Sequence, residues 1–143
     1  MPGRRRIAAL QLIQRIRQHE IDGHAARMNA IRGEQARLQE QVQELDDRVA
    51  AEGRVTAPET AAYLAGFLRA ARVRRAYLSD KIAALDRQAA EIEDALLDSY
   101  RDAKVNDAVL DRALDGQRQH LDRQEAAAME EIARNVYLRQ QRG

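Results

Sequence analysis

Residues 51–59 read AEGRVTAPE, and this stretch decides the fold of the chain. It contains Pro58, and because the other proline lies at the N-terminus, Pro58 marks the one strong interior break. Gly53 can take the left-handed conformation that ends a helix. Thr56 followed three residues later by Glu59 is a capping box, and proline suits the first turn of a helix. One helix is therefore predicted to end near residue 52 and another to begin near residue 57.

Apolar residues before this break recur at alternating steps of three and four, which is the seam spacing of a left-handed coiled coil. Ile7 and Leu10 are in phase with this register, whereas Ile13 and Ile16 lie beside it, so we expect a wider or shifted stripe in the N-terminal turns. The central register comprises Ile21, His24, Met28, Ile31, Gln35, Leu38, Val42, Leu45 and Val49.

The pattern after the break is longer. One register comprises Leu64, Leu68, Ala71, Arg75, Leu78, Ile82, Leu85, Ala89, Ile92, Leu96, Ser99, Ala103, Asn106 and Leu110. A four-residue slip follows, after which the register is predicted to continue through Leu114, Leu121, Ala128 and Ile132. Such a slip locally unwinds a supercoil.

These patterns predict an all-α fold, a two-helix antiparallel coiled-coil hairpin that forms a single domain over residues 1–143. Helix one spans about residues 4–52, the turn about 53–57 and helix two about 58–140. Pairing outward from the turn places residue 49 near residue 60 and residue 7 near residue 103. Helix two then extends past helix one by about 35 residues, or ~50 Å at 1.5 Å per residue. An apolar stripe on that extension invites another chain, and self-association into a dimer is one reading.

The composition sets limits on function. Aromatic residues are 3% and charged residues 33% of the chain, which is typical of long helices rather than of a compact core. The net charge of +1 gives no basic stripe for nucleic acid. The absence of cysteine excludes disulfides and thiolate metal sites. No apolar run reaches ~18 residues and no signal-peptide core is present, so we expect a protein that stays inside the cell.

No sequence motif points to catalysis. His19, His24 and His120 are not spaced as metal ligands, and the chain has no glycine-rich phosphate loop and no cysteine nucleophile. A two-helix hairpin also lacks a concave pocket of catalytic size. We therefore expect no enzymatic activity, no cofactor, no metal and no small-molecule substrate.

A line of side chains after the turn lies beside the predicted seam. It comprises Tyr63, Phe67, Ala70 and Arg74. The two aromatic residues either pack against the turn residues Val55 and Ala57 or form an exposed binding patch, since aromatic and arginine side chains are frequent interface anchors. The basic run 4–6, Arg4-Arg5-Arg6, is either a solvated helix start or a contact for an acidic partner.

With these features the chain resembles the FliJ family, the stalk proteins of the flagellar type III export ATPase complex, which are related to the injectisome YscO/SctO group. The resemblance rests on the unequal hairpin, on residues 63–68 (YLAGFL) and on residues 125–133 (EAAAMEEIA). The family has Gln-Lys where this chain has Ala126-Ala127.

The resemblance implies a stalk that inserts the end carrying both termini into a hexameric export ATPase ring. The candidate ring contacts are Arg4, Arg5, Arg6, Glu125, Met129, Glu130, Glu131 and Ile132. It also implies that Tyr63, Phe67, Ala70 and Arg74 contact the export gate protein FlhA, that export chaperones are handled, and that the protein is cytoplasmic and peripherally associated with the inner membrane. The alternatives are an injectisome stalk of the YscO/SctO type, a coiled-coil secretion chaperone and a structural homodimer.

Overall fold

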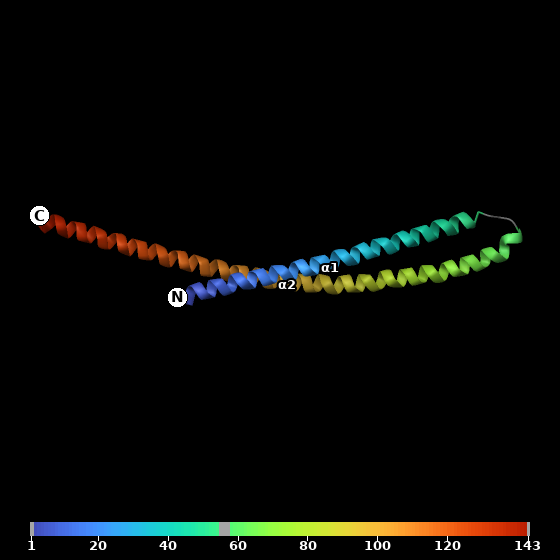
Figure 1. The fold of residues 1–143 in the computed structure, drawn as a ribbon, viewed down its shortest axis with the longest axis horizontal. Helices are drawn as coiled ribbons and strands as arrows, with labels where there is room; N and C mark the ends of the chain where they lie inside the picture. The colour runs from blue at the N-terminus through green and yellow to red at the C-terminus, as the bar shows by residue number, and fades with distance from the viewer. Residues whose placement is uncertain (1, 55–57, 143) are drawn as a thin grey trace. The chain divides into compact units, whose positions relative to one another are not determined.

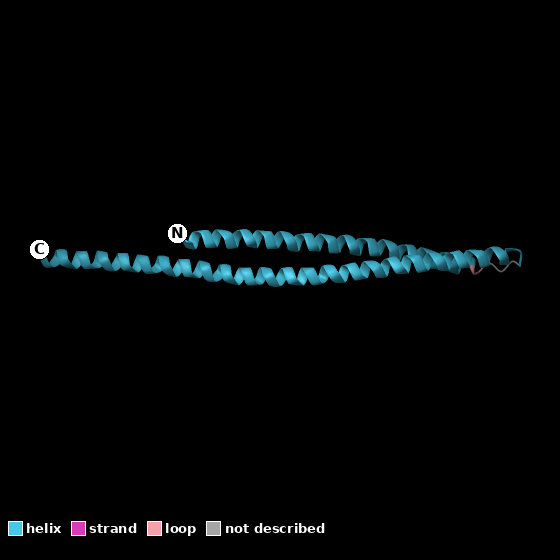
Figure 2. Ribbon diagram, turned by 90° about the horizontal axis from the view of Figure 1, so that it is seen from below, coloured by secondary structure: helices cyan, strands magenta, loops and turns pink. Residues whose placement is uncertain are grey.

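The computed structural model describes residues 2–54 and 58–142, and almost all of them are helical. Helix α1 spans Pro2–Glu52, a 3-10 turn spans Pro58–Thr60, and helix α2 spans Ala61–Arg142 (Figure 2). Helix α1 has 51 residues and α2 has 82. The predicted all-α hairpin with a longer second helix is confirmed.

The contacts of the chain group into two units. Unit 1 joins Met1–Glu20 with Ser99–Gly143, and unit 2 is Ile21–Asp98. In each unit a segment of α1 lies beside a segment of α2 and runs in the opposite direction (Figure 1).

The seam of unit 2 is the register that the spacing predicts. On α1 its buried or half-buried members run from Ile21 to Val49, and all nine predicted positions belong to them. On α2 the corresponding members are Leu64, Leu68, Ala71, Leu78, Ile82, Leu85, Ala89, Ile92 and Leu96. Leu78 is the most deeply buried large side chain, with 2% of its surface exposed. Steps of three and four keep these side chains on one face, so two helices suffice to bury them.

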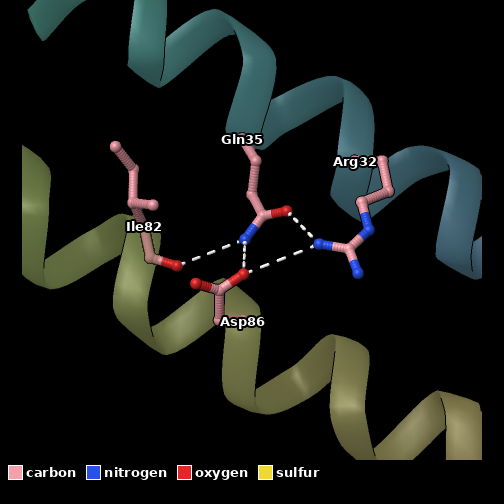
Figure 3. Close-up of polar contacts among 4 residues, drawn as sticks. All are labelled: Arg32, Gln35, Ile82 and Asp86. Carbon is pink, nitrogen blue, oxygen red and sulfur yellow. Dashed lines mark hydrogen bonds and ion pairs between the residues drawn. The ribbon is translucent and has the colours of Figure 1, made fainter.

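A polar cluster interrupts this seam at Gln35, whose side chain is buried (Figure 3). Its amide nitrogen donates to the Ile82 carbonyl oxygen at 3.3 Å and to Asp86 Oδ1 at 2.5 Å. Its amide oxygen accepts a bond of 2.8 Å from Arg32, which also lies 3.6 Å from Asp86 Oδ1. Because both ends of the buried amide have partners, its burial does not leave an unsatisfied polar group.

Arg75 occupies a seam position by its spacing, yet its side chain is exposed and turns to the flank of α1. There it forms two hydrogen bonds with Asp46, of 2.9 and 3.2 Å. The bonds and the positive charge hold the pKa of Asp46 below its ordinary value. The stabilisation from this pair is therefore present above the ordinary carboxyl pKa and is lost as pH falls through the lowered one.

The seam of unit 1 is more polar. Gln14 and Arg17 take seam positions on α1, where they contact Asp107 at 3.1 Å and Asp102 at 3.6 Å. Ile13 and Ile16 are exposed, so the expected wider or shifted stripe in the N-terminal turns is wrong. The reason is that these polar side chains find acidic partners on α2, which lets the register continue unshifted.

Asn106 fixes how far the helices are displaced along each other in unit 1. It is buried, and its amide nitrogen donates to the Leu10 carbonyl oxygen at 3.1 Å. In unit 2 the helices are displaced in the same direction, since Asp46 pairs with Arg75. The predicted pairing of residue 7 with residue 103 and of residue 49 with residue 60 is therefore wrong by about two helical turns. That estimate ignored the chain used by the connection, which includes the 3-10 turn.

The corrected offset shortens the part of α2 that has no partner in the chain. Residues 118–142 are all exposed, which is 25 residues rather than the expected 35 or so. In Figure 1 this segment, coloured orange to red, continues past the N-terminus of α1 in unit 1.

The helix end at Glu52 is as predicted, but its mechanism is different. No described glycine has a positive φ, so Gly53 is not a left-handed cap. Instead its N–H still bonds the Val49 carbonyl at 2.9 Å, and Arg54 N–H bonds the Ala51 carbonyl at 3.3 Å, which tightens the last turn. The predicted capping box includes Thr56, which lies outside the described residues.

The depth of Leu78 gives a test of the seam. Leu78→Ala should lower the free energy of unfolding by about 2–4 kcal/mol, because it leaves a void between the helices. Val73→Ala on the same helix should change it by less than ~0.5 kcal/mol, since Val73 is exposed. Urea denaturation followed by circular dichroism measures both, and equal losses for the two variants would contradict the assigned seam.

Candidate partner-binding surfaces

Side chains on the outer face of α2 in unit 2 form the first candidate surface. The tyrosine surface, as we name it, comprises Tyr63, Ala70, Val73, Arg74, Tyr77 and Lys81, and all six are exposed. At 3.6 residues per turn their spacing places them on one face, which is roughly 100° around the helix from the seam. Val73 is 71% and Tyr63 is 65% exposed, so apolar area faces solvent here.

Tyr77 is the centre of this surface. The Arg74 guanidinium lies 5.2 Å from its ring centroid and the Lys81 ammonium 4.9 Å, so two cations contact the ring. The Lys81 ammonium donates a hydrogen bond to the Tyr77 hydroxyl oxygen. This bond and the positive charge of Lys81 hold the pKa of the Tyr77 hydroxyl below its usual value. Ala70, Val73 and Arg74 line a shallow depression against the ring. A cationic, partly apolar surface of this kind suits a partner that is both acidic and apolar.

The predicted line of four residues falls only partly on this surface. Tyr63, Ala70 and Arg74 are exposed, while Phe67 is half-buried. The alternative packing partners of the aromatic residues, Val55 and Ala57, lie outside the described residues.

Sequence reasoning missed three members of the surface, namely Val73, Tyr77 and Lys81. These residues follow Ala70 by three, seven and eleven positions, a helical spacing that keeps them on one face. The sequence therefore contained the signal that extends the predicted line by two turns.

The second candidate surface is the C-terminal stripe, which we define as Leu114, Leu121, Ala128, Met129, Ile132 and Val136 of α2. The predicted slip would bring the first two into the seam, but the structure does not. Ala113 and Gln117 are the half-buried residues that continue the seam beside α1, and Leu114 and Leu121 are exposed. The apolar stripe therefore leaves the intrachain seam at Leu114 because the helix pair keeps its register while the apolar residues shift by one position.

The predicted ring contacts lie in two separate groups within unit 1. Arg4 and Arg6 line a groove of about 380 Å³ together with Ile7, Ala113 and His120. Arg5 is exposed. The second group, Glu125, Met129, Glu130, Glu131 and Ile132, is exposed on the part of α2 that continues beyond this groove. The structure does not bring the two groups into contact.

The N-terminal part of α1 adds exposed apolar area to unit 1. The sequence pattern placed Ile13 and Ile16 beside the seam and gave no role to Leu12. Leu12, Ile13 and Ile16 of α1 are all exposed. A partner that covered the termini would therefore find apolar side chains on both helices of unit 1.

Neither a metal-binding cluster nor a membrane-spanning helix occurs among residues 2–54 and 58–142. No cluster of histidine, aspartate and glutamate there has the arrangement to hold a metal ion. Neither helix has, within the same ranges, a stretch that is long and apolar enough to cross a membrane.

Comparison of the chain with protein-family models, with curated proteins and with solved structures found no match. The features of the chain that bear on its function are therefore the two surfaces and the segments 63–68 and 125–133 that carry the family resemblance.

The contact of Tyr77 with Lys81 can be tested by titration. In a background where the other tyrosines are replaced by phenylalanine, the Tyr77 pKa should lie below that of a free tyrosine, because the ammonium stabilises the tyrosinate. Lys81→Gln should raise it, whereas Lys104→Gln, a matched control on the same helix, should not. Ultraviolet difference spectroscopy against pH gives these values, and an unchanged Tyr77 pKa in Lys81→Gln would contradict the contact.

Proposed function

We propose that the chain is a stalk and adaptor of the flagellar type III protein export apparatus, which links a hexameric export ATPase to the gate protein FlhA and assists export chaperones. In this role it has no chemistry of its own. It works in the cytoplasm and associates with the inner membrane only through its partners.

The observation that carries this proposal is the tyrosine surface. Aromatic and arginine side chains are the commonest interface anchors, and here they lie on an outer helical face that the hairpin does not use for its own packing. Tyr63, Ala70 and Arg74 also occupy positions that the family resemblance assigns to the gate contact. The surface supports a gate contact extended to Val73, Tyr77 and Lys81.

The exposed apolar residues of unit 1 support the ATPase end of the proposal. Leu12, Ile13 and Ile16 on α1 and the C-terminal stripe on α2 give unit 1 apolar area on more than one side. Inside a ring of identical subunits, such an irregular surface contacts each subunit differently. Contacts of different strength shift the nucleotide-dependent equilibrium of each subunit by a different amount, and this is how a stalk couples to an ATPase.

The ATPase half of the proposal is tested with the purified hexamer from the same cell. Turnover should rise when the protein is added, and the two should co-elute in gel filtration. Leu12→Gln/Ile16→Gln should weaken the stimulation, while Leu97→Gln, at an exposed leucine of α2, should leave it intact. Absence of both stimulation and co-elution would refute a stalk role and leave the secretion-chaperone reading.

The gate half is tested by a matched pair of tyrosine variants. Tyr77 is 47% and Tyr100 is 48% exposed, and both are on α2. Tyr77→Ala should weaken binding to the cytoplasmic part of the gate protein by roughly 10- to 30-fold, as expected for an interface anchor. Tyr100→Ala should bind as the unchanged protein does, and equal losses for both variants would rule out the tyrosine surface as the contact.

A further inference from the structure

We propose that the C-terminal stripe pairs with the same stripe of a second copy of this chain, in antiparallel orientation. This inference is independent of the export role. It starts from the point where the apolar residues leave the intrachain seam, at Leu114. Beyond it, Leu121, Ile132 and Val136 are 53%, 57% and 47% exposed, although a leucine-and-isoleucine stripe at seam spacing is the pattern that coiled coils bury.

The charges on the stripe decide the orientation. Arg118 and Glu125 stand at seam spacing between the apolar members, and Arg139 follows Val136 at the same spacing. In a parallel dimer each of these side chains would face its own copy across the interface, which puts like charges together three times. An antiparallel pair avoids this, because each charged residue then faces a different residue of the second copy.

The residues flanking the stripe decide the register. In an antiparallel pair the flanking residues on one side of the interface face one another, so charges there select among alignments. One alignment places Leu121 opposite Ile132 of the second copy. In this alignment the flanking charged residues, such as Asp122 and Glu131, do not face residues of like charge. Sliding by one heptad in one direction sets Asp122 opposite Asp122 of the second copy. Sliding in the other direction sets Glu131 opposite Glu131. The first alignment is therefore the favoured one.

The same alignment satisfies three further features. Glu125 comes opposite Ala128, the smallest member of the stripe, so its aliphatic stem has space. Arg118, which pairs with Asp115 in its own helix, comes within one turn of Glu131 of the second copy. The apolar residues 136–138 of the second copy come opposite residues 115–117, next to the groove that Gln117 lines together with Ile7.

The area available matches a weak dimer. The segment 114–139 is between three and four heptads long, which is the shortest length at which coiled-coil seams are usually sustained. Its apolar side chains from two copies would bury on the order of 1,000 Å², at the lower limit of specific interfaces. Association in the micromolar range of concentration is therefore expected rather than a permanent dimer.

Sedimentation equilibrium of the full chain tests the pairing. The average mass should rise from one chain towards two between roughly 1 and 100 μM. Leu121→Gln/Ile132→Gln should weaken association by roughly 30-fold or more, since it removes both members of two apolar layers of the interface. The control Leu97→Gln/Val105→Gln, which replaces two exposed apolar residues outside the stripe, should associate as the unchanged chain does. Circular dichroism verifies that both variants remain helical.

Cysteine cross-linking tests the orientation, because the chain has no cysteine of its own. When Leu121→Cys and Ile132→Cys chains are mixed under oxidising conditions, disulfides should form between the two variants. Each variant alone should cross-link poorly, since the two copies of one position lie about eleven residues apart along the helices. Efficient cross-linking of Leu121→Cys with itself would overturn the antiparallel arrangement. A single-chain mass at every concentration, or unchanged association of the stripe variant, would overturn the pairing itself.

Discussion

The axial register of α1 against α2 is the constraint on which the rest of the structure depends. When one helix slides past the other by one heptad, an apolar seam with steps of three and four packs equally well. Apolar contacts alone therefore fix the axial register only weakly. Polar groups inside the seam remove this freedom. Gln35 reaches the Ile82 carbonyl and Asp86 in unit 2, and Asn106 reaches the Leu10 carbonyl in unit 1. After a slide, these buried amides would lose their partners at a cost of roughly 1–3 kcal/mol each.

This register determines which residues remain available to partners. In unit 1 it places the start of α1 beside Ala113 and Gln117, so the residues of α2 after Gln117 are exposed. In unit 2 it turns Arg75 towards Asp46 while Arg74 remains exposed beside Tyr77. Two adjacent arginines therefore have different roles, one holding the helices together and one facing outward. Both candidate surfaces follow from where the seam lies and where it ends.

The sequence predicted the faces of the helices well and their positions along the axis poorly. Periodicity reports the angle of a residue around its helix, and so the seam from Ile21 to Val49 and from Leu64 to Leu110 was largely predictable. It does not report offset, which depends on the connection and on contacts such as Asp46 with Arg75. The same limit explains the misplaced slip at Leu114. Apolar spacing showed that the apolar residues of α2 change position around the helix after Leu110. It did not show whether the contact with α1 follows that change.

The C-terminal stripe has two proposed occupants, and they exclude each other. An ATPase ring and a second copy would each cover Leu121, Met129 and Ile132, so only one can do so at a time. The two differ in how they depend on concentration. Pairing of identical chains falls away on dilution, whereas a ring that binds through additional contacts at Leu12 and Ile16 retains the chain. The charged residues between the members of the stripe, Arg118 and Glu125, keep the dimer weak, and weak pairing allows the stripe to be shielded when free and released to a larger partner.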